Sequence, residues 1–265
     1  TIDNNLEASA IAQSCLWGLS NVIAIEHPEC WGGIIDLDTN SPVNEADLLL
    51  TAITNLEKED RIAIRKQKTY VARLNKSQSG TLGANGHLPL PESKVKSTNS
   101  YLITGGLGAL GLKLSQWLVE KGAKHLVLVG RNHPSSEAKQ AIAKWEKLGV
   151  KILVAQADVS VEADAIVLLE KCKQSIPAIA GIIHAAGVLD DGILIEQNWQ
   201  RFLQAIAPKV FGAWNLHNLT QDLSLDFFVT FSSVASLIGS PGQGNYAVAN
   251  AGLDAIARYR QAKGL

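Results

Sequence analysis

Beyond residue 100, short apolar runs alternate with longer segments in which apolar residues recur at helical spacing. Near-continuous apolar strands separated by helices are typical of βαβ units, in which helices cover both faces of a parallel sheet. The predicted strands are residues 101–103, 126–129, 152–155, 179–183 and 227–231. We therefore predict an α/β fold with a doubly wound parallel sheet, whose ligands bind at the carboxyl ends of the strands.

The residues before this region predict a smaller αβ unit with an incomplete sheet. Its elements are an amphipathic segment at 6–26, a strand at 33–37, a helix at 45–55 and strands at 61–64 and 69–74. Residues 75–100 then lose apolar periodicity and are rich in Gly, Pro, Ser, Asn and Lys, which is typical of a linker or surface loop. We expect three parts: 1–75, a linker at 76–100, and 101–265.

Composition narrows the function classes. The chain has 265 residues, of which 46% are hydrophobic, and this is enough apolar surface for a sizeable core. Its 24 basic and 25 acidic residues give a net charge of -1, which argues against a basic surface for nucleic acid or an anionic membrane. No apolar run approaches the roughly 18 residues that span a bilayer, so we expect a soluble, cytoplasmic protein.

The three cysteines indicate neither a disulfide framework nor a metal site. Cys15, Cys30 and Cys172 are odd in number, far apart, and without the spacing of metal ligands. We interpret them as buried packing residues in a reducing compartment, and we expect no metal.

A glycine-rich turn follows the first strand of the second region. It runs Thr104-Gly105-Gly106-Leu107-Gly108-Ala109-Leu110-Gly111, and Gly106, Gly108 and Gly111 fit the pattern G-x-G-x-x-G. Between a strand and a helix, this pattern lets the backbone approach a pyrophosphate at a helix N-terminus, although a glycine-rich turn can also be only a turn. The strand before it and the helix after it favour a Rossmann-type dinucleotide site, with Gly105 and Leu107 also in contact.

The ends of the next strands favour NADP over NAD. Arg131 stands where an NAD site usually has an acidic residue for the ribose 2′-hydroxyl, and a guanidinium suits a 2′-phosphate. The alternative is a solvated arginine at a strand end. Asp158 and Val159 follow the third strand and are placed to meet the adenine, although Asp158 could equally cap the next helix.

The fourth strand ends in His184-Ala185-Ala186-Gly187. The small residues Ala185, Ala186 and Gly187 allow close approach of a cofactor. We interpret His184 as a packed or cofactor-adjacent residue rather than a general base, because the sequence offers it no triad partners.

The fifth strand and the following helix supply the groups needed to reduce a carbonyl. The strand ends in Phe231-Ser232-Ser233, and Tyr246 and Asn250 lie four residues apart, on one face of a helix. One donor can hold the ketone oxygen and another can deliver a proton, while a nicotinamide gives the hydride. A phenolic acid works better beside a cation that stabilises its phenolate, and Lys209, in a helical stretch at 198–219, is the candidate.

Together these motifs resemble the ketoreductase (KR) domain of modular type I polyketide synthases, within the short-chain dehydrogenase/reductase superfamily. The resemblance rests on GGLGALG, HAAG, Pro208-Lys209-Val210, FSS and Y-x-x-x-N. Most of the superfamily has Y-x-x-x-K, whereas the polyketide branch has Asn in the catalytic helix and Lys in the preceding helix. The arrangement of Asn250 and Lys209 matches that branch.

The resemblance implies specific roles for these residues. Tyr246 is the proton donor, Ser233 rather than Ser232 is the second donor to the ketone, Lys209 tunes Tyr246 and binds the ribose, and Asn250 organises water and the other side chains. The implied reaction is NADPH-dependent reduction of a β-ketoacyl thioester on the phosphopantetheine arm of an acyl carrier protein. The other domains of the same synthase are further implied partners.

Two further features of the resemblance concern stereochemistry and domain organisation. Leu189, Asp190 and Asp191 resemble the motif of the subtype that makes a D-configured hydroxyl, and Ile238 and Val248 stand where other subtypes have Trp and Pro. A D-hydroxyl product without epimerisation is therefore implied, although Asp190 and Asp191 could be plain loop carboxylates. Residues 1–75 resemble part of the non-catalytic, Rossmann-like structural subdomain that precedes these reductases, and 101–265 resemble the NADP-binding catalytic subdomain.

The chain has no Met and begins at Thr1, so we expect a piece of a longer synthase. Its ends would lie inside the structural subdomain and after the catalytic helix, before the lid, leaving activity of the isolated piece open. The alternatives are a reductase of a free small-molecule ketone, a nucleotide-sugar epimerase, which Arg131 and Asn250 disfavour, and a reductase-like structural module without turnover.

Overall fold

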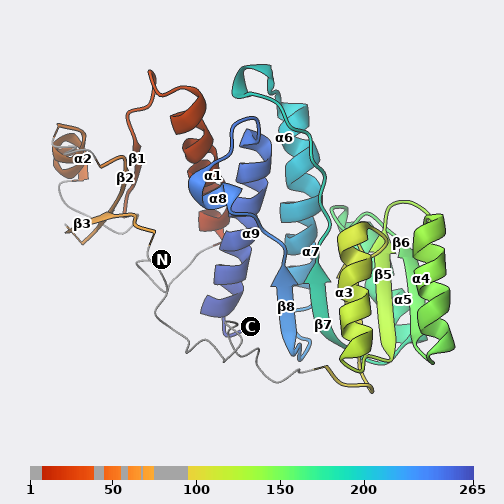
Figure 1. The fold of residues 1–265 in the computed structure, drawn as a ribbon. Helices are drawn as coiled ribbons and strands as arrows, with labels where there is room; N and C mark the ends of the chain where they lie inside the picture. The colour runs from red at the N-terminus through yellow and green to blue at the C-terminus, as the bar shows by residue number, and fades with distance from the viewer. Residues whose placement is uncertain (1–7, 39–44, 55–58, 67, 75–94) are drawn as a thin grey trace, which may run out of the picture.

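The computed structural model describes residues 8–38, 45–54, 59–66, 68–74 and 95–265. Its larger part is a five-stranded sheet in the order β6-β5-β4-β7-β8, with every neighbouring pair parallel (Figure 1). The strands are β4 (Ser100–Thr104), β5 (His125–Gly130), β6 (Lys151–Gln156), β7 (Ile179–His184) and β8 (Phe227–Thr230). The prediction of a doubly wound parallel sheet is confirmed.

Alternate residues of the strands face two separate cores, as the pleat requires. Tyr101 and Ile103 of β4 pack with α3 (Ala109–Glu120) and α4 (Ser136–Lys147). Leu102, between them, packs on the other face with α5 (Glu162–Ser175) and α7 (Gly212–Leu219). Because the chain leaves β4 first toward β5 and later returns to its other side for β7, the carboxyl ends of β4 and β7 form a topological switch point, the usual place for a ligand in open α/β sheets.

The N-terminal elements form a second, smaller sheet. Strands β1 (Ile34–Asp36) and β2 (Arg61–Arg65) are parallel, and β3 (Lys68–Val71) is antiparallel to β2. Helix α2 (Glu45–Thr54) lies between β1 and β2 in the sequence. Helix α1 (Ser9–Glu26) lies between this sheet and α9 (Gly244–Ala262) and packs mainly on α9 (Figure 1).

Helices α1 and α9 approach closely because glycines face the other helix. A Cβ on Gly18 of α1 would lie 2.5 Å from the carbonyl oxygen of Ala247, and one on Gly252 of α9 would lie 3.2 Å from the sulfur of Cys15. The remaining short elements are a 3-10 turn (Leu194–Glu196), α6 (Trp199–Ile206) and α8 (Ala235–Ile238).

Three details differ from the sequence-based predictions. The helical stretch expected at 198–219 is α6 and α7 joined by a π-helical turn, Ala207–Phe211, because Pro208 has no N–H to continue the α-helical ladder. Cys30 is exposed, so its interpretation as a buried packing residue is wrong, whereas Cys172 is buried. Strand β4 begins at Ser100, at the end of the expected linker, and the strands expected to end at Leu74 and Phe231 end at Val71 and Thr230.

Part of the expected linker, residues 75–94, lies outside the described residues. Within the part of the chain that is described, no helix combines the length and apolar character needed to cross a membrane. In the same residues, no group of three or more His, Cys, Asp or Glu side chains is placed to hold a metal ion.

Candidate active site

The glycine-rich turn after β4 is shaped by the absence of side chains. Gly105 has φ +65°, and a Cβ there would lie 2.8 Å from the carbonyl oxygen of Ala185, so the turn rests directly on the end of β7. A Cβ on Gly111 would lie 2.2 Å from the Gly105 carbonyl oxygen. Helix α3 starts after Gly108, which provides no side-chain cap, so its first-turn amides and its dipole favour an anion.

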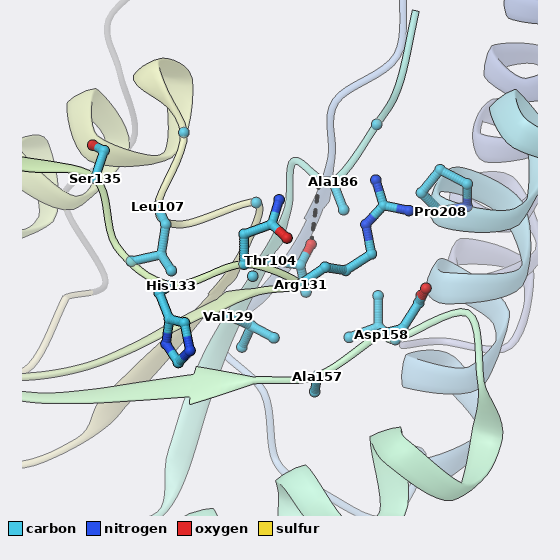
Figure 2. Close-up of a pocket in the computed structure, with 16 residues that line it drawn as sticks. Thr104, Leu107, Val129, Arg131, His133, Ser135, Ala157, Asp158, Ala186 and Pro208 are labelled. Carbon is cyan, nitrogen blue, oxygen red and sulfur yellow. Dashed lines mark hydrogen bonds between the residues drawn. The ribbon is translucent and has the colours of Figure 1, made fainter.

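A cavity of about 310 Å³ opens between this turn and the ends of β5, β6 and β7 (Figure 2). Eight of the predicted cofactor residues line it: Gly105, Leu107, Gly108, Arg131, Asp158, Val159, Ala186 and Gly187. The other five, Gly106, Gly111, Ala185, Lys209 and Tyr246, are not among its lining residues, and the first three of these form the turn and its support. Gly106, for example, donates its N–H to the carbonyl of Val129 and lies against β5.

Arg131 and Asp158 lie on the same side of the cavity. The Arg131 side chain extends toward Ala186 and Pro208 (Figure 2). Among the residues that the structure describes, its guanidinium has no carboxylate partner and is exposed, so it is available to a phosphate. Asp158 accepts hydrogen bonds from the N–H and hydroxyl of Ser160, so it stabilises the local turn rather than capping α5, whose N-cap is Val161.

His184 is a buried connector, as predicted. Its Nδ1 lies 2.8 Å from the Thr104 hydroxyl oxygen, and its Nε2 lies 2.9 Å from the Lys209 carbonyl oxygen. Burial lowers the pKa of His184 to about 4, so the ring is neutral near pH 7. A carbonyl only accepts, so Nε2 carries the proton and Nδ1 accepts from Thr104. The Thr104 hydroxyl in turn accepts the Ala186 N–H at 3.3 Å and holds the end of β7.

Lys209, Asn250 and Tyr246 form a connected group behind the cavity. The Lys209 ammonium donates to the side-chain oxygen of Asn250 at 3.0 Å and to the carbonyl of Phe231 at 2.9 Å. The Asn250 amide nitrogen donates to the Tyr246 carbonyl at 2.8 Å, and the Lys209 nitrogen lies 5.2 Å from the centre of the Tyr246 ring. Burial lowers the pKa of Lys209 to about 8, and the carboxylate of Asp254 partly opposes this. The π-helical turn thus places a cation beside the phenol.

The two serines after β8 have different environments. Ser232 donates its hydroxyl to the backbone carbonyl of Asn250 at 3.3 Å and so faces α9. The Ser233 hydroxyl oxygen accepts the Ala235 N–H at 3.2 Å, and the Ser233 carbonyl accepts from the Ser236 hydroxyl at 2.8 Å. Because the oxygen of Ser233 accepts locally, its proton is available to an acceptor such as a ketone oxygen.

Comparison with known proteins identifies the family. The family model of the KR domain matches residues 99–265. The chain belongs to the KR domain family. It is 39% identical over 278 residues to a 6-methylsalicylic acid synthase of Arthrobotrys oligospora, covering 97% of this chain and 15% of that protein. It is 37% identical over 261 residues to a phenolphthiocerol/phthiocerol polyketide synthase of Mycobacterium tuberculosis, covering 98% of this chain and 14% of that protein.

Solved ketoreductase structures resemble this chain over nearly its whole length. The structure described as A-type ketoreductases from a modular polyketide synthase has a TM-score of 0.86 and 35% identity, covering 97% of this chain and 53% of that chain. A ketoreductase domain from the bacillaene assembly line has a TM-score of 0.85 and 28% identity, covering 98% and 60%. The chain therefore belongs with the KR domains of polyketide synthases, an oxidoreductase family whose superfamily uses nicotinamide cofactors.

The loop after β7 is held by an arginine that sequence reasoning missed. Both carboxylate oxygens of Asp190 pair with Arg201, at 3.0 and 2.8 Å, and Arg201 also donates to the Asp191 carbonyl at 2.7 Å. The hydrogen bonds from Arg201 hold the pKa of Asp190 below its usual value. Leu189 is 64% exposed at the start of the loop, and Asp191 accepts from Gln243 at 3.1 Å.

Asn245 is a second residue that sequence reasoning missed. It is completely buried, donates to the Asp190 carbonyl at 2.8 Å, and accepts the Tyr246 N–H at 2.7 Å. It therefore connects the loop at 189–191 directly to α9, the helix that carries Tyr246. Its position before Tyr246 at the start of a helix, where Asn often satisfies a free amide, is the signal that could have identified it.

Proposed function

We propose that this domain reduces the β-keto group of a β-ketoacyl thioester, carried on the phosphopantetheine arm of an acyl carrier protein, with NADPH. The observation that carries the proposal is the contact between Lys209 and Asn250 at 3.0 Å, with the Lys209 nitrogen 5.2 Å from the Tyr246 ring centre. This arrangement, beside a cavity suited to a dinucleotide, combines a proton donor with a cation that stabilises its conjugate base.

The cavity residues fit NADPH. The unobstructed turn at Gly105 and Gly108 and the start of α3 suit the pyrophosphate, and the exposed guanidinium of Arg131 suits the 2′-phosphate. Asp158 and Val159 flank the place proposed for the adenine. When bound, the nicotinamide supplies the hydride to the β-carbon of the substrate.

In the proposed reaction, Tyr246 gives its phenolic proton to the ketone oxygen while the Ser233 hydroxyl donates a hydrogen bond to the same oxygen. Lys209 stabilises the resulting phenolate. Its ammonium has three N–H groups, and the described residues use two of them, for Asn250 and Phe231, so one is left for the ribose or the phenolate. Asn250 holds Lys209 in place and organises water near it.

The proposed product carries a D-configured hydroxyl, without epimerisation of the α-carbon. Support comes from Leu189, Asp190 and Asp191, which resemble the motif of that subtype and lie in a loop connected to Tyr246 through Asn245. We also propose that residues 1–75 are a structural subdomain, 76–100 a linker and 101–265 the catalytic subdomain. The chain spans about one seventh of the length of the curated relatives, consistent with further domains of a cytoplasmic synthase as partners.

The test is NADPH oxidation by the full-length protein with a β-ketoacyl group on its carrier protein. Tyr246→Phe should lose most of the turnover and still bind NADPH. The matched control is Tyr259→Phe on the same helix, where the ring packs against Trp214 and His217 away from the cavity. Equal rates with the free ketone would favour a small-molecule reductase, and NADPH binding without oxidation would indicate a non-catalytic module.

A further inference from the structure

The last residue of α1 reaches from the N-terminal subdomain to two loops of the catalytic region. The Glu26 carboxylate accepts the N–H of Leu194 through one oxygen at 2.6 Å and the N–H of Gly242 through the other at 2.7 Å. The two donors are separated from Glu26 by 168 and 216 residues. One side chain thus holds two distant backbone segments at once.

The two segments flank the catalytic group. Leu194 follows the loop that carries Asp190 and Asp191, and Gly242 precedes Tyr246 at the start of α9. The segments also meet directly, because the Gly192 N–H donates to the Gly242 carbonyl at 2.7 Å. The spacing between the loop at 189–191 and the tyrosine therefore depends on the same short piece of backbone that Glu26 holds.

The position of Glu26 points to these contacts rather than to stabilisation of its own helix. Glu26 ends α1, and a carboxylate at a helix C-terminus opposes the helix dipole, so the helix gains nothing from it. The end of α1 is also seated tightly against the segment before α9. A Cβ on Gly239, which has φ +76°, would lie 2.7 Å from the carbonyl oxygen of Asn21.

We propose that Glu26 is a positioning residue for substrate orientation: it fixes the loop after β7 relative to Tyr246 and thereby selects the face of the ketone that is reduced. This inference rests on the proposed function. Hydrogen bonds to a carboxylate are stronger than those between neutral groups. Because the two oxygens of one carboxylate each hold a different loop, the loops can neither slide past each other nor separate without breaking one of these bonds. The N-terminal subdomain then contributes to stereochemistry without touching the substrate.

The experiment compares Glu26→Gln and Glu26→Ala with the wild type in the full-length protein. Gln can accept only one of the two N–H groups and presents its NH₂ to the other, while Ala accepts neither. The minor hydroxyl configuration should rise about tenfold relative to the major one in Glu26→Ala, which loses both hydrogen bonds, and less in Glu26→Gln, which loses one. KM for the acyl substrate should rise, with an unchanged Kd for NADPH. The control is Glu29→Gln, an exposed residue paired with His27.

A second measurement is independent of turnover. Hydrogen exchange of the peptides containing Leu194 and Gly242 should accelerate in both Glu26 variants and stay unchanged in Glu29→Gln. Unchanged exchange, or an unchanged product ratio and KM in an active, folded Glu26→Gln, would overturn the inference. Loss of the fold in Glu26→Gln would overturn it as well, because the carboxylate would then be structural only. If the wild type oxidises no NADPH but its hydrogen exchange still differs from that of the Glu26 variants, it is the proposed function that fails.

Discussion

The ammonium nitrogen of Lys209 and the side-chain oxygen of Asn250 are 3.0 Å apart, and this contact joins the π-helical turn to α9. Lys209 is buried, yet its hydrogen-bond acceptors among the described residues are an amide oxygen and a backbone carbonyl rather than a carboxylate. Neutral acceptors compensate a buried charge less well than an anion does, which explains why burial lowers the pKa of Lys209 to about 8.

The first prediction follows from this pKa. Lys209 is mostly charged at pH 7 and loses its proton as the pH rises through about 8, so kcat/KM for ketone reduction should fall above pH 8. Asp254 raises the pKa of Lys209, so Asp254→Asn should move this alkaline limb to lower pH. Asn can still accept the Ser236 hydroxyl that Asp254 accepts at 2.7 Å, so the fold should persist. An alkaline limb at the same pH in wild type and variant would contradict the assignment.

The second prediction separates two glycines of the turn. A Cβ on Gly111 would overlap the backbone oxygen of Gly105 at 2.2 Å, whereas a Cβ on Gly108 would lie at an ordinary 3.4 Å from the same oxygen. Gly111→Ala should therefore destabilise the protein by roughly 2 kcal/mol or more. Gly108→Ala should leave the melting temperature nearly unchanged but weaken NADPH binding, because Gly108 lines the cavity. Thermal denaturation and fluorescence titration with NADPH distinguish the two effects.

The third prediction concerns acid stability. Burial lowers the pKa of His184 from 6.5 to about 4, so between these values the unfolded chain binds more protons than the folded one. The free energy of unfolding should therefore fall as the pH decreases from about 6.5 to 4, with a contribution of roughly 3 kcal/mol from His184. In His184→Gln this part of the slope should disappear, whatever the variant's absolute stability. His27→Gln, at the surface, is the control, and denaturant melts across this pH range give the slopes.

The sequence predicted the large sheet well because its strands are buried on both faces. Leu126 to Val129 of β5, for example, are all buried. Such a continuous apolar run predicts a buried strand even when the neighbouring strands are not known. The glycine-rich turn was equally readable, since a strand, the turn and a helix follow one another directly. Local patterns therefore located the strands and eight of the residues that line the cavity.

Other features depend on partners far away in the sequence. Nothing near Glu26 indicates that its carboxylate meets Leu194 and Gly242, which are 168 and 216 residues away. The π-helical turn was missed because apolar spacing continues through Pro208, and the exposure of Cys30 was missed because a cysteine's environment is set by tertiary packing. Asn245 was overlooked for the same reason, although its place before Tyr246 offered a clue.

The last prediction tests the choice of cofactor. The guanidinium of Arg131 is exposed at the cavity and has no carboxylate partner among the described residues, so it can pair with the 2′-phosphate of NADPH. Arg131→Ala should raise the Kd for NADPH by about 10- to 100-fold, the range for loss of a hydrogen bond between charged groups, and leave the Kd for NADH within about twofold. NADH lacks only that phosphate, so it controls for damage to the rest of the cavity. Equal weakening of both cofactors would show that Arg131 shapes the site without reading the phosphate, and raised salt should reduce NADPH affinity more in the wild type than in the variant.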